Sequence, residues 1–162
     1  MAAIKRVDHI ALAVRNVDKS IAVFQKLFGA KLITKKRGMV QGHLMSMAYM
    51  QVGESVFVLD EAVDPEGFIA TFIEKRGEGL HHLGLEVDNL DEYVQELESK
   101  GVPIRVKSLD GELRREILLG PREANGVVCQ VIEWKGGADV SLEERIERVR
   151  QYREVDEENP ED

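Results

Sequence analysis

The sequence predicts an α+β fold in which two βαβββ modules form a curved, mixed β-sheet around a central site, with helices outside and a C-terminal helical extension. Three observations lead to this prediction. The order of one strand, one helix and three strands occurs twice, key residues recur at nearly equal spacing in the two series, and 43% of the 162 residues are hydrophobic, enough to bury a core. The modules are expected at residues 1–64 and 80–135, with a linker containing a short helix at 65–79 and a C-terminal helix and acidic tail at 136–162.

The first module opens with a strand at residues 7–14, where aliphatic residues alternate along the chain. Apolar residues at helical spacing follow, from Ile21 to Phe28, between the cap residue Asn16 and the terminating Gly29. Three strand-like segments complete the module, at residues 31–35, 43–52 and 55–59, with turn signals between them at Arg37-Gly38 and Gly53-Glu54.

A short helix is expected at residues 67–75, ahead of the second module. That module opens with a strand at residues 81–87, and its helix begins at Asn89 and ends at Gly101. Three strands are expected after this helix, near residues 103–107, 112–119 and 127–134.

An amphipathic helix is predicted beyond the second module, at residues 141–153. Ser141 with Glu144 three positions later forms a capping-box pattern at its start. The helix is expected to pack on the domain or on a partner subunit. The acidic residues 154–162 are expected to be disordered, because they lack apolar side chains to bury.

The repeat is supported by the spacing of residues along the chain. His9 lies 20 positions before Gly29, and His82 lies 19 positions before Gly101, so the two series agree within one residue. A histidine early in the first strand of each module would place two imidazoles close together once the modules pack. Imidazole nitrogen suits Zn, Fe, Co, Ni or Mn, so we expect a divalent metal site.

The last strand of each module is where an oxygen ligand would come from. The position 49 residues after His9 is Val58, and the position 48 residues after His82 is Gln130. An amide in the middle of an apolar strand must find a partner when it is buried, whereas valine has no ligand atom.

Several segments resemble methylmalonyl-CoA epimerases, which belong to the vicinal oxygen chelate superfamily of glyoxalases, bleomycin-resistance proteins and extradiol dioxygenases. The resemblance covers about residues 5–135. Its most specific part is the run Glu-Lys-Arg-Gly-Glu-Gly-Leu-His-His at residues 74–82, and further matching segments are residues 8–14, 117–122 and 126–128.

The resemblance implies that His9, His82 and Gln130 bind the metal, and that Gln130 also stands at a catalytic position. Val58 stands where the family has an acid or amide ligand, and Gln130 stands where it has a glutamate. Epimerisation needs groups that remove and return a proton beside an enolate, and an amide cannot carry that proton. The expected ligand cage is therefore altered at two positions.

Two residues are candidates to compensate for these changes. His43 lies on the strand where the family often places a second proton carrier, and Asp60 shares a strand face with Val58, so it is a candidate metal ligand. Arg122 matches a basic position of the family and is a candidate for binding a substrate carboxylate or a CoA phosphate. Glu133 and Cys129 are expected to face away from the site.

The expected function is that of a metal-dependent, methylmalonyl-CoA epimerase-like isomerase that stabilises the enolate of an acyl-CoA or a small oxo acid. The metal is expected to be Zn, Co, Ni, Mn or Fe. One alternative is a dioxygenase or glyoxalase-type lyase on the same scaffold, and another is a non-catalytic small-molecule-binding protein with a decayed metal site. The expected partners are a small-molecule substrate, with acyl-CoA as the candidate, and a second copy of the chain in a homodimer.

Composition narrows the function classes further. A formal net charge of −8 and a pI near 5.1 argue against nucleic-acid binding, which needs clustered basic residues. The single cysteine excludes an internal disulfide, and no apolar run reaches the roughly 18 residues that a membrane span requires. We therefore expect a cytoplasmic protein without a membrane partner.

Overall fold

A computed structural model describes residues 2–152, and the acidic segment 154–162, for which disorder was predicted, lies outside the described residues. The chain has the predicted α+β fold with a mixed sheet. It divides into two compact units, which are described separately. Unit 1 comprises residues up to 10 together with 81–148, and unit 2 comprises residues 11–80 together with the chain from 149.

The order of elements confirms that strand, helix and three strands occur twice. The elements are β1 (Ile4–Val14), α1 (Val17–Phe28), β2 (Lys31–Val40), β3 (His43–Val52), β4 (Ser55–Ala62), α2 (Phe68–Arg76), β5 (Gly79–Val87), α3 (Leu90–Ser99), β6 (Val106–Ser108), β7 (Arg114–Leu119), β8 (Val128–Trp134) and α4 (Leu142–Gln151). In the described part of the chain, no helix combines the length and the apolar character needed to cross a bilayer.

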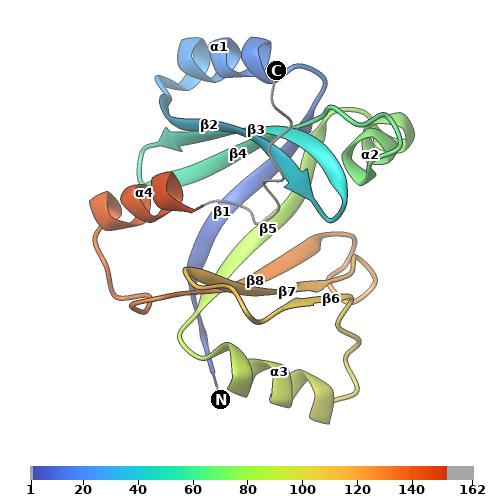
Figure 1. Cartoon of the computed structure of the whole chain (residues 1–162), viewed down its shortest axis with the longest axis vertical. Helices are drawn as coiled ribbons and strands as arrows, with labels where there is room; N and C mark the ends of the chain where they lie inside the picture. The colour runs from blue at the N-terminus through green and yellow to red at the C-terminus, as the bar shows by residue number, and fades with distance from the viewer. Residues whose placement is uncertain (1, 153–162) are drawn as a thin grey trace. The chain divides into compact units, whose positions relative to one another are not determined.

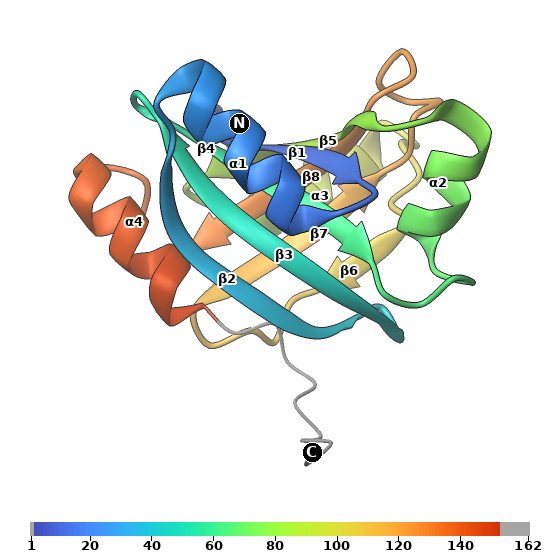
Figure 2. The same ribbon diagram turned by 90° about the horizontal axis from the view of Figure 1, so that it is seen from above.

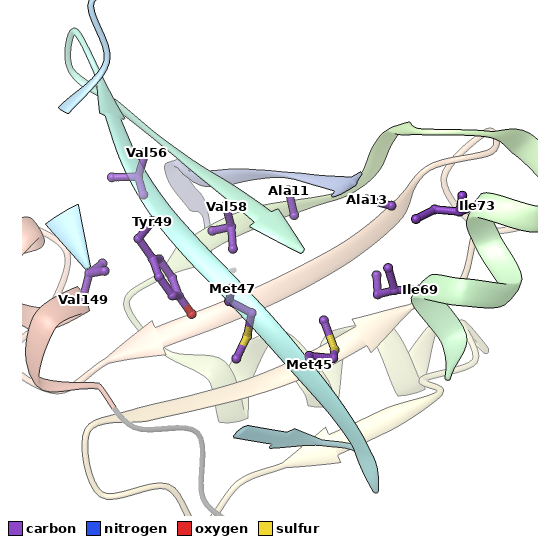
Figure 3. Packing of buried hydrophobic residues seen from close by; sticks show 10 residues of the cluster. All are labelled: Ala11, Ala13, Met45, Met47, Tyr49, Val56, Val58, Ile69, Ile73 and Val149. Atoms are coloured by element: carbon purple, nitrogen blue, oxygen red, sulfur yellow. The ribbon is translucent and has the colours of Figure 1, made fainter. Parts of the chain in front are cut away.

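Unit 2 has the strand order β2-β3-β4-β1, with the last part of β1 at its edge. Helix α1 packs on β3 and β4 and covers one face of these strands (Figures 1 and 2). The opposite face carries an apolar cluster that includes Met47 and Tyr49 of β3, Val58 of β4, and Ile69 and Ile73 of α2 (Figure 3). Apolar clusters therefore lie on both faces of this unit.

One predicted turn of unit 2 is wrong. The turn signal at Gly38 lies inside β2, where Gly38 pairs with Met45, and the chain reverses at Gln41 and Gly42. These two residues have positive φ angles of 50° and 80°, as a two-residue hairpin turn with type I′ geometry requires. Glutamine is an unusual first residue for such a turn, so its sequence signal is weak.

Unit 1 has the strand order β1-β5-β8-β7-β6, in which β5 and β8 are parallel and β8, β7 and β6 are antiparallel. Helix α3 covers one face (Figure 1), where Leu90 and Val94 pack against Ile117 and Val131. The other face carries buried polar side chains. The two faces of this unit therefore differ in chemistry, and the polar face holds the candidate site.

Helix α4 begins with the predicted capping box. The Ser141 backbone N–H donates to Glu144 Oε2 at 3.0 Å, and the Glu144 backbone N–H donates to Ser141 Oγ at 3.2 Å. Farther along α4, the Arg145 guanidinium donates to the Asp8 carbonyl at 3.0 Å. The start of α4 is thus attached to the strand that carries His9.

Candidate metal centre

Two of the predicted histidines meet on the polar face of unit 1. His9 of β1 and His82 of β5 have their Nε2 atoms 3.1 Å apart, and their rings meet edge to face with centroids separated by 5.2 Å. His9 is only 6% exposed. The strand pairing places two imidazole nitrogens at a distance where a single cation can contact both.

Asp8 orients the first of these rings. The Asp8 carboxylate lies 2.8 Å from His9 Nδ1 through Oδ1, and its Oδ2 accepts a 2.8 Å hydrogen bond from Trp134 Nε1. Burial alone would raise the pKa of Asp8, but the contacts with His9 and Trp134, with the nearby Arg114, leave this pKa lowered. When His9 donates its Nδ1–H to this carboxylate, its Nε2 lone pair faces His82, as in carboxylate–histidine–metal sites.

Gly84 provides the space that the His9 ring occupies. A Cβ atom at position 84 would lie 2.4 Å from both Nδ1 and Cε1 of His9, far inside van der Waals contact. The ring therefore lies against bare backbone of β5, and any side chain at position 84 would displace it. Glycine here is required by close packing.

His82 is flanked by His81. The Nδ1 atoms of the two rings are 2.9 Å apart. Burial, followed by the charges of His9, His81 and Arg114, lowers the pKa of His82 well below its ordinary value, and burial lowers the pKa of His81 to about 4. Both rings are therefore neutral near pH 7, which is the form that binds a metal.

Gln130 of β8 lies on the same face, opposite Gly84 in the parallel register. Its Nε2 donates to Glu116 Oε1 at 2.8 Å. The side chain also lies beside His82 and raises the pKa of that ring, although this contact is weaker than the effect of burial. Among the described residues, Gln130 Oε1 has no partner with hydrogen-bond geometry, although it is buried. A buried acceptor oxygen on a side chain beside the His82 imidazole is suited to ligate a cation.

These residues fit a divalent metal. Nitrogens that ligate one Zn²⁺ lie about 2.0–2.1 Å from it, which places two such nitrogens about 3–3.4 Å apart. The 3.1 Å separation of the Nε2 atoms of His9 and His82 falls in that range. Gln130 Oε1 adds an oxygen donor without a competing partner among the described residues. Two imidazoles and one oxygen leave coordination positions for substrate or water.

Unit 2 contains Val58, which stands at a ligand position of the family, and Asp60, the candidate to replace that ligand. Val58 is 4% exposed and lies within the apolar cluster (Figure 3), so it offers no ligand. Asp60 is two residues farther along β4, opposite Met47, and is 3% exposed. It shares the strand face of Val58, as expected from alternation. Its role as a metal ligand stays a prediction.

His43, the candidate proton carrier, stands at the start of β3 in unit 2. Its Nδ1 lies 2.6 Å from Asp64 Oδ2, and its ring meets Phe68 edge to face. The contact with His43, assisted by the Glu66 backbone N–H, lowers the pKa of Asp64. A carboxylate on Nδ1 fixes the ring tautomer and leaves Nε2 as the basic atom.

The remaining sequence candidates lie elsewhere. Arg122 is exposed in the turn between β7 and β8. Cys129 packs with the α3 cluster, where burial raises the pKa of its thiol. Glu133 pairs with Arg115 and accepts a hydrogen bond from the Leu90 backbone, so it faces α3, as expected.

Sequence reasoning missed the residues that support the histidines. Asp8 and His9 are consecutive, buried and in contact, which departs from the alternation expected of a strand. Glu116 and Gly84 did give signals, since a charged residue within an apolar strand and a glycine inside a strand both invite explanation. Trp134 gave none, because its contact with Asp8 depends on pairing across 126 residues.

Comparison with known proteins identifies relatives in sequence and in fold. Residues 8–115 match the profile of the Glyoxalase/Bleomycin resistance protein/Dioxygenase superfamily. The uncharacterized protein YqjC of Bacillus subtilis is 27% identical over 133 residues, covering 81% of this chain and 94% of that protein. The mitochondrial methylmalonyl-CoA epimerase of Homo sapiens is 26% identical over 133 residues, covering 78% of this chain and 72% of that protein. The crystal structure of methylmalonyl-CoA epimerase from Mycobacterium tuberculosis superposes with a TM-score of 0.71 at 25% identity, covering 80% of this chain and 88% of that one.

Proposed function

The chain belongs to the Glyoxalase/Bleomycin resistance protein/Dioxygenase superfamily, and from this premise we propose that it is a metal-dependent isomerase of the methylmalonyl-CoA epimerase kind. Its substrate is an acyl-CoA or a small oxo acid that reacts through an enolate. The observation that carries the proposal is the 3.1 Å approach of His9 Nε2 and His82 Nε2, with Asp8 orienting the first ring. The similarity to human and mycobacterial methylmalonyl-CoA epimerases supports the substrate class.

His9, His82 and Gln130 of unit 1 would hold the metal, the histidines through Nε2 and the glutamine through Oε1. Asp60 of unit 2 stays a separate candidate ligand predicted from the sequence. A divalent ion held there, of Zn, Co, Ni, Mn or Fe, supplies positive charge that stabilises an enolate oxygen. Asp8 keeps the His9 tautomer that leaves Nε2 unprotonated.

His43 is the proposed proton carrier. Asp64 holds its Nδ1, so that Nε2 accepts the acidic proton between the thioester and carboxylate carbons of a malonyl-type substrate. Gln130 occupies the other catalytic position, where its amide can hydrogen-bond an oxygen but cannot transfer a proton, so solvent water returns the proton to the opposite face of the enolate and His43 releases its proton to solvent. Arg122 is the proposed partner of a substrate carboxylate or a CoA phosphate.

Proton exchange tests this proposal. Protein purified without chelator is incubated with methylmalonyl-CoA in D₂O, and deuterium at C2 is followed by mass spectrometry. We expect incorporation that is lost in His9→Ala and falls about 10²–10⁴-fold in His43→Gln, the usual contribution of a general base. Glu133→Gln, on the α3 face, is the matched control and should leave exchange unchanged. Bound metal without exchange would contradict this substrate.

The altered positions favour the alternative functions. Val58 has no ligand atom and Gln130 no titratable group, which suits a dioxygenase, a glyoxalase-type lyase or a non-catalytic binding protein better than a two-base epimerase. Metal analysis separates these cases. Protein without bound metal supports the binding protein, and metal without proton exchange supports one of the other enzymes.

The proposal extends to the assembly of the chain. We propose a cytoplasmic homodimer, with residues 1–64 and 80–135 as two repeat modules, residues 65–79 as the linker and residues 136–162 as the extension. Sedimentation equilibrium tests the dimer, and a monomeric mass at micromolar concentration would contradict it.

A further inference from the structure

We infer that Glu116 is a positioning residue that fixes the orientation of the Gln130 amide, so that its oxygen faces the two histidines. This inference rests on the proposed metal function. Glu116 lies on β7, and neither the repeat nor the resemblance assigns it a role. Strand β7 would thereby place the Glu116 carboxylate beside Gln130 of the neighbouring strand β8, the candidate ligand that is an amide in this chain.

The orientation follows from hydrogen-bond chemistry. An ionised carboxylate only accepts hydrogen bonds, so the group that Gln130 directs toward Glu116 must be its NH₂. The Nε2–Oε1 distance between them is 2.8 Å. A flipped amide would place two acceptor oxygens against each other. Glu116 therefore selects one of two amide orientations that differ little in shape, and the selected one leaves Oε1 on the side away from Glu116.

Oε1 is thereby directed to the metal centre. It is buried and has no partner with hydrogen-bond geometry among the described residues. The Gln130 side chain that carries it lies beside the His82 ring. Gln130 is 8% exposed, so water does not readily replace the missing partner. A metal ion at the His9 and His82 nitrogens would satisfy this oxygen.

Arg114 holds Glu116 in place. Its guanidinium lies 2.5 Å from Glu116 Oε2 and over the Trp134 ring, with Cζ 5.4 Å from the ring centroid. Trp134 in turn donates to Asp8, the partner of His9. Contacts therefore run from Gln130 through Glu116, Arg114 and Trp134 to Asp8, and they orient both an oxygen and a nitrogen ligand.

Exchanging the Gln130 amide and the Glu116 carboxylate, singly or together, tests this arrangement. Gln130→Glu alone would set two carboxylates against each other. The double exchange Gln130→Glu with Glu116→Gln restores a donor facing an acceptor, and again leaves one carboxylate oxygen for the metal. Glu116→Gln alone creates two amides, which can pair in either orientation.

The experiment measures Co²⁺ binding by competition titration, together with the visible d–d spectrum, which reports ligand geometry independently of activity. Glu116→Gln should weaken Co²⁺ binding about 10-fold or more, the usual effect of removing a partner of a metal ligand, and should alter the spectrum. The double exchange should recover wild-type affinity or exceed it. Glu133→Gln, another paired carboxylate of unit 1, should change neither readout. Glu116→Asp keeps the charge but shortens its reach, and it replaces Glu116→Gln if that variant fails to fold.

Two results would overturn the inference. If folded Glu116→Gln or Glu116→Asp kept the wild-type Co²⁺ affinity and spectrum, the Gln130 amide would need no orienting partner. If the doubly exchanged variant bound Co²⁺ as weakly as Glu116→Gln, Glu116 would act through stability alone. Failure of the proposed function looks different. In that case wild-type protein binds Co²⁺ no better than His9→Ala, and the inference falls with it.

Discussion

Gly84→Ala tests the packing on which the histidine pair depends. The added Cβ would lie 2.4 Å from two atoms of the His9 ring, so the ring or the backbone of β5 must move. Overpacking of this kind costs about 1–3 kcal/mol, and the lower backbone entropy of unfolded alanine offsets about 0.4–1 kcal/mol. We expect a net destabilisation of about 1–2 kcal/mol, which lowers the melting temperature by about 2–8 °C for a chain of this size.

Metal binding should fall with stability, because the displaced ring loses both Asp8 and His82. A loss of about 10-fold or more is expected, as for other changes that disorient a metal ligand. Gly38→Ala is the matched control, since Gly38 also lies in a strand but a Cβ added there would meet no atom within 4 Å. Calorimetric melting and metal titration of both variants provide the measurement. Equal melting temperatures and metal affinities for the two would refute the account of Gly84.

Three further predictions concern residues of unit 1. Trp134→Phe keeps an aromatic ring but leaves the buried Asp8 carboxylate without one donor. The free energy of unfolding at pH 7, measured by urea titration, should therefore fall by about 1–3 kcal/mol, and an unchanged midpoint would contradict this expectation. Glu86 is buried on β5, and this burial raises the pKa of its carboxyl above the ordinary 4.5, with the charge of Asp8 adding to the shift. The stability that this group contributes is therefore fully present below pH 4.5 and is lost as the pH rises through the raised pKa. Glu86→Gln should therefore gain stability relative to wild type as pH rises, and a difference that stays constant from pH 4 to 8 would exclude the shift. Ser141→Ala should cost about 1 kcal/mol through loss of the α4 cap, whereas Glu144→Gln, which can still close the capping box, should cost less in the same urea titration.

The repeating order of elements was predictable because local signals were strong and doubled. The two helices open at Asn16 and Asn89 as predicted, and in the structure each asparagine side chain accepts a hydrogen bond from a backbone N–H three residues later. Short or weakly marked elements were less accurate. The strand expected at 103–107 is the three-residue β6, and the Gln41-Gly42 turn was missed in favour of Gly38.

The site was predictable only where the repeat reached it. Matching offsets in the two modules pointed to His9 and His82, and the structure places their Nε2 atoms together. Asp8 and Glu116 lie outside this logic, because a break in strand alternation and a side-chain pair between neighbouring strands depend on register. Register is set by the packing of the whole sheet and cannot be obtained from spacing along one strand.

X-ray absorption of Zn²⁺-loaded protein tests the central claim most directly, because the fine structure counts imidazole ligands. We expect a first shell of nitrogen and oxygen at about 2.0–2.1 Å with outer-shell scattering from two imidazole rings. His82→Ala should remove one ring from this signal, and His9→Ala should do the same. A wild-type spectrum without imidazole scattering, or one that neither substitution changes, would contradict a metal centre built on His9 and His82.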